Sequence, residues 1–169
     1  MTSARAAARA ERLIALGTAR GLKVATAESC TGGMVVAALT AVAGSSAVVD
    51  RSFVTYSNEA KHELLGVPLA LIDRFGAVSA EVARAMAAGA LKCSRADIAV
   101  AITGIAGPSG GSAGKPVGLV WFALAAGGVP TRTERRVFSG ASRALVRARA
   151  TETALALIER AMLSDPMAA

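Results

Sequence analysis

Residues 43 to 61 contain a serine, a tyrosine and a lysine in a pattern that suggests nucleophilic catalysis. Ser46 precedes an apolar run, Tyr56 follows that run as the only tyrosine of the chain, and Lys61 comes soon after. A serine hydroxyl attacks a carbonyl only when a base removes its proton, and a lysine can be that base when burial lowers its pKa. The three residues therefore have the chemistry of a nucleophile, a proton carrier and a base. Local geometry alone does not bring them together, so an ordinary polar edge is the alternative.

A second polar stretch, residues 29 to 33, lies between two apolar segments. A strand that turns through Ser29 and Thr31 into a helix leaves free N–H groups that can bind an anion. Gly32 and Gly33 allow the backbone to approach a ligand closely. The same residues also fit ordinary N-capping of the following helix. Both interpretations remain open from the sequence.

The chain has few cysteine and histidine residues that could act in catalysis or metal binding. Cys30 beside a helix start, with His62 as its base, is another candidate nucleophile. His62 lies among charged residues of an expected helix surface, where a lone histidine is usually solvent-exposed. Two cysteines, Cys30 and Cys93, and one histidine are too few for a disulfide framework or a zinc cluster. We therefore expect reduced thiols and no metal.

The glycine-rich segment 105–116 does not fit a nucleotide-binding motif. A Walker A motif needs a serine or threonine after its lysine, whereas Pro116 follows Lys115, and Ser109 stands where the first glycine should be. A strand–GxGxxG–helix unit is also missing from the sequence. We expect this segment to be a flexible rim or lid over a pocket.

Helical and strand patterns alternate along the chain. The expected helices cover residues 4–20, 34–42, 58–66, 80–92 and a final stretch from about 142, and the expected strands cover 22–29, 48–57, 96–104, 117–125 and 131–138. Two glycines between the last two strands favour an antiparallel hairpin. This order predicts an α/β fold: a three-layer α/β/α sandwich around a mostly parallel mixed sheet, in one domain over residues 1–169. Ligands bind at the carboxyl ends of strands in such sheets, and polar stretches follow three of the expected strands.

The composition limits the possible partners. The net charge is +7, but the arginines alternate with apolar positions of the first and last helices, as on solvated helix faces. Attraction of small anionic substrates is the alternative use of this charge. Without a groove-reading motif or an aromatic platform, the sequence gives no support to nucleic-acid binding. No apolar run reaches the roughly eighteen residues of a membrane span, so we expect no membrane association and a cytoplasmic location.

Seven ordered motifs resemble a known family: "TAESCTGG", "AGSS", "FVTYSNEAK", "GAVS", "ITGIAGPSGG", "KPVG" and "FSG". In this order they resemble the CinA carboxy-terminal domain family, the nicotinamide-nucleotide amidohydrolases, from about Ala4 to Met162. The resemblance implies a stand-alone domain that hydrolyses the carboxamide of nicotinamide mononucleotide to nicotinate mononucleotide and ammonia. It also implies a role in pyridine-nucleotide salvage and no metal or organic cofactor.

The resemblance further implies roles for individual residues. Ser46 and Lys61 correspond to the catalytic pair, with Tyr56 nearby and Ser45 as the alternative nucleophile. Arg143 follows the "FSG" motif. The other residues expected in the substrate pocket are Ser29, Thr31, Gly32, Gly33 and Thr103. We expect a homo-oligomer, because the alanine-rich helix faces and the hairpin edge offer surfaces for a second subunit. The alternative function is a nucleotide-binding or regulatory protein with little turnover.

Overall fold

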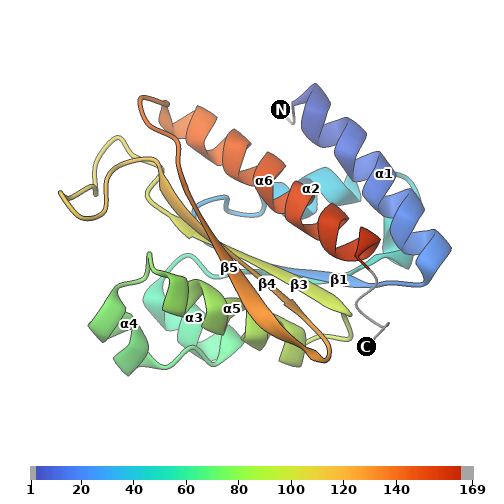
Figure 1. Ribbon diagram of the computed structural model, residues 1–169, viewed down its shortest axis with the longest axis horizontal. Helices are drawn as coiled ribbons and strands as arrows, with labels where there is room; N and C mark the ends of the chain where they lie inside the picture. The colour runs from blue at the N-terminus through green and yellow to red at the C-terminus, as the bar shows by residue number, and fades with distance from the viewer. Residues whose placement is uncertain (1–2, 165–169) are drawn as a thin grey trace.

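The computed structural model describes residues 3–164, which form a five-stranded sheet between two layers of helices (Figure 1). The strand order is β2-β1-β3-β4-β5. The pairs β2–β1 and β1–β3 are parallel, and β3–β4 and β4–β5 are antiparallel. The strands are β1 (Val24–Glu28), β2 (Val49–Val54), β3 (Ile98–Gly104), β4 (Leu119–Ala126) and β5 (Val129–Val137). The α/β class and the mixed sheet with its hairpin are confirmed, with two parallel and two antiparallel strand pairs instead of the expected parallel majority.

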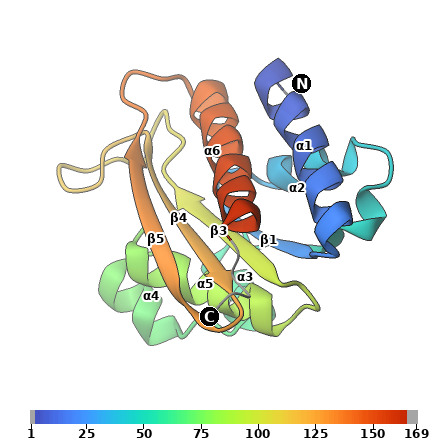
Figure 2. The ribbon, with the colours of Figure 1, turned by 45° about the vertical axis from the view of Figure 1, so that its right-hand side comes forward.

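Helices cover both faces of the sheet, as the turned view makes clear (Figure 2). One layer consists of α1 (Ala4–Arg20), α2 (Met34–Thr40) and α6 (Arg143–Leu163). The other consists of α3 (Asn58–Leu65), α4 (Leu69–Phe75) and α5 (Ala80–Lys92). Each layer forms its own hydrophobic core with one face of the sheet. No helix within residues 3–164 combines the length and the apolar content needed to cross a bilayer.

The two faces of β3 carry side chains of different size, because alternate residues of a strand point to opposite faces. Ile98, Val100 and Ile102 pack in the core with α1, α2 and α6. Ala99 and Ala101 pack in the core with α5. All five side chains are fully buried. The small residues leave room for α5 to lie close to the sheet, as the alanine-rich composition suggests.

The structure differs from the expected elements in two places. Helix α4 was not predicted, because it is short and follows Pro68 without a side-chain N-cap. The expected strand 48–57 ends at Val54, because the next residues form the turn into α3. Ser57 caps that helix, its Oγ accepting the N–H of Ala60 at 3.0 Å.

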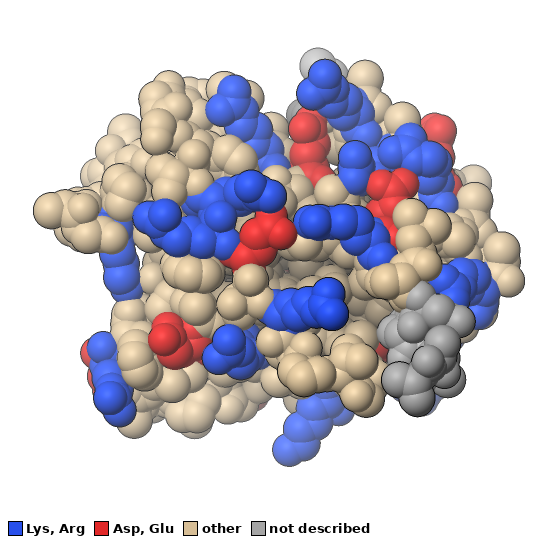
Figure 3. All heavy atoms as spheres, viewed as in Figure 1, with Lys and Arg blue, Asp and Glu red and all other residues tan. Residues whose placement is uncertain are grey.

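Several charged side chains on the face formed by α1, α6 and β5 form ion pairs. Arg9 and Arg12 each lie 2.9 Å from Glu159, and Arg160 lies 3.2 Å from Glu134. Basic and acidic side chains are interspersed over this face, without a continuous basic patch (Figure 3). Exposed pairs of this kind contribute about 0–1 kcal/mol each. The arrangement agrees with the expected solvated helix faces.

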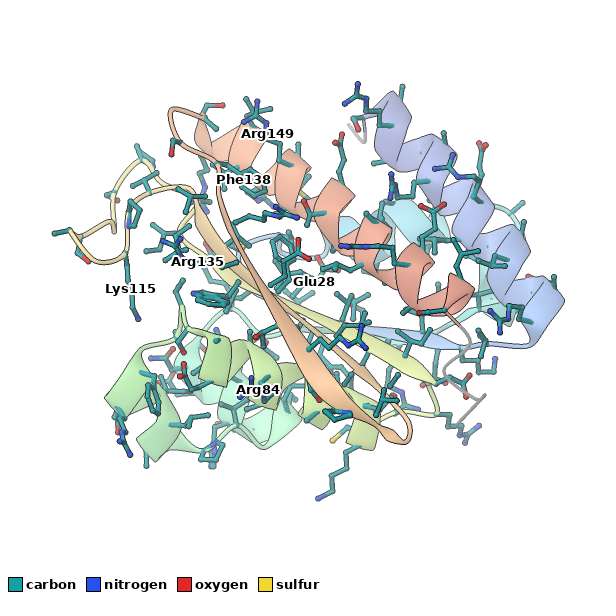
Figure 4. All side chains as sticks on the ribbon, viewed as in Figure 1. Glu28, Arg84, Lys115, Arg135, Phe138 and Arg149 are labelled. Atoms are coloured by element: carbon teal, nitrogen blue, oxygen red, sulfur yellow. The ribbon has the colours of Figure 1, made fainter. Side chains whose placement is uncertain are left out.

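Glu28 holds the start of α2 from inside the protein. Its side chain is fully buried at the end of β1 (Figure 4). The carboxylate accepts hydrogen bonds from the N–H groups of Gly33, Val35 and Val36 at 3.0, 3.1 and 2.9 Å. A carboxylate at a helix N-terminus satisfies donors that otherwise lack partners, and the helix dipole favours its charge.

Glu28→Gln is expected to lower the free energy of unfolding by about 2–4 kcal/mol, because the amide replaces an accepting oxygen with an N–H₂ group that opposes backbone donors. Urea denaturation measures the loss. The matched control is Glu63→Gln on the exposed surface of α3, which should change the same free energy by less than about 0.5 kcal/mol. Equal, small effects of both substitutions would contradict the role given to Glu28.

Candidate active site

A pocket of about 210 Å³ lies at the carboxyl ends of β1, β2 and β3. This is the position that the polar stretches after the strands predict. Its wall includes Ser29, Tyr56, Asn58, Lys61, Thr103 and Arg143. Two larger hollows, of about 390 and 690 Å³, lie along α6 and β5. Their described lining residues include no buried titratable side chain, so the smaller pocket is the better candidate for chemistry.

Lys61 is the central charged group of this pocket and is only 1% exposed. Its Nζ donates to the carbonyl oxygens of Thr55, Tyr56 and Ser57 at 2.9, 3.2 and 3.3 Å. The Oγ of Ser29 lies 3.2 Å from the same nitrogen. The turn that leads into α3 thus places its carbonyl groups around the lysine. With three carbonyl oxygens and one serine hydroxyl, the Nζ has four oxygen neighbours, one more than an ammonium group has N–H donors.

Burial is the main influence on the ionisation of this site. It lowers the pKa of Lys61, because the ammonium ion loses its hydration. Negative charge on Cys30 or Glu59 acts in the opposite direction. Burial also raises the pKa of Cys30 to about 12, so this thiol is neutral at physiological pH. A lysine with a lowered pKa beside a serine hydroxyl is the arrangement that serine–lysine catalysis requires.

Ser46, expected as the nucleophile, does not lie in this pocket. It is exposed in a short 3-10 helix, η1 (Ser45–Ala47), which precedes β2, whereas Lys61 follows β2. The six residues of β2 span about 20 Å, so η1 and the pocket lie at opposite ends of the strand. The structure therefore does not form the Ser46–Lys61 pair, and the alternative Ser45 is excluded for the same reason.

Ser29 is the serine that the structure brings to Lys61. Strands β1 and β2 are parallel, with Glu28 opposite Val54, so the residues that follow both strands emerge side by side. The N–H of Ser29 donates to Ile102 O at 2.9 Å, which ties this turn to β3 as well. The sequence motif around Ser29 indicates a place in the pocket but no role in the chemistry.

Tyr56 and Arg143 lie together in the pocket wall. One terminal nitrogen of Arg143, Nη2, donates to Tyr56 Oη at 3.0 Å. The other, Nη1, donates to Gly107 O at 2.8 Å, which holds the glycine-rich segment to the start of α6. Tyr56 is 62% exposed, so these two side chains form the outer part of the pocket. Thr103 is buried in the wall, and its hydroxyl donates to Ala77 O at 2.8 Å.

Thr31, Gly32 and Gly33 do not line the pocket, contrary to the expectation. The N–H of Gly33 donates to Glu28, as do two further N–H groups of α2. The helix start therefore has its own internal anion, and a phosphate cannot use the same donors. The sequence pattern could not reveal this, because a buried glutamate at the end of a strand reads as part of the strand.

Of the remaining polar residues considered, one lines the pocket and the others lie outside it. His62 is exposed, and its Nδ1 lies 2.9 Å from Val67 O, so it does not face Cys30 in the pocket. Asn58, which the sequence did not single out, also lines the pocket at the first position of α3. Lys115 extends from the glycine-rich segment toward α4, where its Nζ donates to Phe75 O at 2.6 Å (Figure 4). In the described part of the chain, no group of three or more His, Cys, Asp or Glu side chains is arranged to hold a metal ion.

Comparison with known proteins gives close relatives over most of the chain. A protein from Escherichia coli (strain K12), named nicotinamide-nucleotide amidohydrolase PncC, is 53% identical over 147 residues, which cover 87% of this chain and 88% of that protein. A protein of the same name from Enterobacter agglomerans is 55% identical over 122 residues, covering 72% and 74% of the two chains.

The fold and the family model agree with these relatives. The crystal structure of the competence/damage inducible protein CihA from Agrobacterium tumefaciens matches with a TM-score of 0.93 and 48% identity, over 97% of this chain and 99% of that chain. The family model of the CinA C-terminal domain matches residues 6–162. These residues include every strand of the sheet and the whole wall of the Lys61 pocket. The chain belongs to the CinA C-terminal domain family.

Proposed function

We propose that the protein hydrolyses the carboxamide of nicotinamide mononucleotide to nicotinate mononucleotide and ammonia, with Ser29 as nucleophile and Lys61 as base. The observation that carries the proposal is the 3.2 Å contact between Lys61 Nζ and Ser29 Oγ in a buried pocket. The substrate class comes from the relatives that bear the name nicotinamide-nucleotide amidohydrolase. The same reaction places the protein in pyridine-nucleotide salvage.

The first half of the reaction acylates Ser29. In the neutral form Lys61 has two N–H groups, which stay with backbone carbonyl oxygens, and a lone pair, which replaces the N–H that contacts the Ser29 hydroxyl. Lys61 takes the hydroxyl proton while Oγ attacks the carboxamide carbon, and the carbonyl electron pair moves onto oxygen. When the C–N bond breaks, the proton held by Lys61 passes to the leaving nitrogen, which departs as ammonia.

The second half regenerates the serine. Lys61, neutral again, takes a proton from a water molecule that attacks the nicotinoyl ester on Ser29 Oγ. The ester C–O bond breaks, and Lys61 returns the proton to Ser29. The product leaves as a carboxylic acid that releases its proton to solvent, which gives nicotinate mononucleotide. The lowered pKa of Lys61 suits both halves, because the amine must be neutral at the start of each.

The size of the pocket orients the substrate. Its volume of about 210 Å³ is below the roughly 300–1,000 Å³ of sites that enclose drug-sized ligands, so it suits the pyridine carboxamide rather than a whole nucleotide. The ribose and phosphate then extend outward past Tyr56. Arg143 is our candidate for binding the phosphate. Its guanidinium has five N–H donors, and Tyr56 and Gly107 accept one hydrogen bond each, which leaves three donors.

The direct test is incubation of the purified protein with nicotinamide mononucleotide, without added metal, with ammonia and nicotinate mononucleotide both quantified. We expect the two products in equal amounts. Free nicotinamide, with its own ring carboxamide but no ribose phosphate, should be a poor substrate because it cannot reach Arg143. Tight binding of the nucleotide without release of ammonia would instead support a binding or regulatory protein.

A further inference from the structure

The hollow of about 690 Å³ on the face formed by α1, α6 and β5 is lined mainly by charged side chains. Helix α6 runs between α1 and β5 (Figure 1), and the small residues Ala8, Thr153 and Ala156 contribute to the lining among longer side chains. None of its described lining residues belongs to the Lys61 pocket. We call it the arginine hollow, after Arg5, Arg9, Arg12, Arg136, Arg149 and Arg160.

Positive charge exceeds negative charge in the arginine hollow. Its lining contains two glutamates, Glu134 and Glu152, against six arginines. Glu159, which pairs with two of these arginines, adds a third carboxylate. Three positive charges therefore remain uncompensated. Lysine and arginine side chains accordingly cover more of this face than acidic side chains do (Figure 3).

Glu159 holds two of the arginines while it is itself largely covered. It lies 2.9 Å from both Arg9 and Arg12. Its side chain is 17% exposed, whereas that of Arg12 is 58% exposed. A guanidinium has five N–H donors, so the donors that face solvent remain available to a ligand.

Glu134 repeats this arrangement on β5. It lies 2.5 Å from Arg136 and 3.2 Å from Arg160. Its side chain is 25% exposed, whereas that of Arg160 is 63% exposed. The hollow thus turns guanidinium groups toward solvent and covers the carboxylates that hold them. An anion that approaches this face meets the arginines first.

The other two arginines form no ion pair within residues 3–164. Arg149 is exposed and lies near Phe138, which also lines the hollow (Figure 4). Arg5 is exposed in the first turn of α1, which contains no acidic residue. A cation at a helix N-terminus opposes the helix dipole, so Arg5 lowers the stability of its own helix. Residues that break a local rule in this way are expected at functional sites.

We propose that the arginine hollow binds a small anion with several phosphate groups. A single phosphate is satisfied by one or two guanidinium groups, whereas the arginines here come from α1, β5 and α6 and suit successive phosphates of one ligand. The volume lies within the roughly 300–1,000 Å³ of typical ligand sites. Because the hollow is separate from the Lys61 pocket, this site does not depend on the proposed function.

The test is calorimetric titration of the purified protein with inorganic triphosphate at about 0.15 M salt, where attraction by net charge is largely screened. We expect one site per chain with a Kd below about 100 µM. Orthophosphate should bind at least about tenfold more weakly, because it reaches fewer arginines. Arg143→Gln, in the Lys61 pocket, should keep the Kd of triphosphate. Loss of triphosphate binding in that variant would place the anion in the Lys61 pocket and overturn the proposal.

Two double variants separate the hollow from the overall charge. Arg5→Gln with Arg149→Gln removes two charges that form no ion pair in the described chain, and the Kd should rise about tenfold or more. The matched control is Arg84→Gln with Lys92→Gln, two exposed residues of α5 on the other face of the sheet (Figure 4). This control should change the Kd by less than about twofold. Equal changes in both variants would show attraction by net charge alone and overturn the proposal.

The remaining outcomes also decide the question. A wild-type Kd above about 1 mM overturns the proposal, and so does a folded Arg5→Gln, Arg149→Gln protein that binds within twofold of the wild type. If circular dichroism shows that this variant does not fold, Arg149→Gln alone serves, with an expected rise in Kd of about threefold. Adenosine triphosphate is the second probe. Binding at least as tight as that of triphosphate assigns the site to nucleotides, and weaker binding assigns it to inorganic polyphosphate; both results support the phosphate site.

Discussion

Ser29→Ala is expected to lower kcat for nicotinamide mononucleotide hydrolysis by about 10⁴-fold or more, while Ser46→Ala keeps wild-type activity. Removal of the nucleophile from a serine hydrolase leaves only the contribution of binding and oxyanion stabilisation. Ser29 Oγ is the hydroxyl 3.2 Å from Lys61 Nζ, whereas Ser46 is exposed at the opposite end of β2. The same chemical change at two serines thus tests position alone. The measurement is initial-rate release of ammonia.

The two variants control for each other. Both delete one hydroxyl from a turn, so both should retain the melting temperature of the wild type within a few degrees. The Ser29→Ala protein should still bind nicotinamide mononucleotide, since the pocket wall and Arg143 remain. The assignment of the nucleophile would fail if folded Ser29→Ala kept more than a tenth of wild-type kcat. A selective loss in Ser46→Ala would restore the serine that the family resemblance suggested.

Lys61→Met has the second largest expected effect, a fall in kcat of about 10³-fold, within the range for loss of a general acid–base group. Methionine has a similar length and suits a buried position, so the fold should persist. Lys61→Arg should not restore activity, because a guanidinium does not release its proton near neutral pH. Single-turnover measurements with folded variants, checked by circular dichroism, give the rate of the acylation step.

The pH dependence gives Lys61 an independent signature. Its neutral form is the base, so kcat/KM should rise as pH rises through the pKa of the lysine. Because burial lowers this pKa, the rise should occur below about 10.4, the ordinary lysine value. The fall of kcat/KM at low pH should be absent from the residual activity of Lys61→Met. If the same fall persists in that variant, the titrating group is another residue.

Much of the fold could be predicted from the sequence because its signals are local. Hydrophobic periodicity separated the helices from the strands, and the glycines at 127 and 128 marked the hairpin. Boundaries were less accurate where tertiary structure competed with propensity. The β-rich segment 48–57 continues past Val54, but the backbone beyond it turns to wrap Lys61 and cap α3. Helix α4 escaped prediction because a short helix without a polar N-cap carries no clear signal.

Residues of the pocket that are close in sequence could be grouped from the sequence alone. Tyr56 and Lys61 share one turn and one helix start, so their common motif already places them together. The residues that complete the site come from other parts of the chain. Ser29 is 32 residues from Lys61 in sequence, and Arg143 is 87 residues from Tyr56. Chain spacing carries no information on such contacts, which depend on strand pairing and helix packing.

The sequence by itself determined the alternation of helices and strands, the polar stretches after three strands, and Lys61 as the candidate base. Only the tertiary structure decided which serine meets that base. The parallel register that sets Glu28 opposite Val54 brings Ser29 beside Lys61 and leaves Ser46 at the far end of β2. Burial then lowers the pKa of the lysine. Both effects arise from packing between distant segments, because register and desolvation are properties of the folded chain and not of any local stretch.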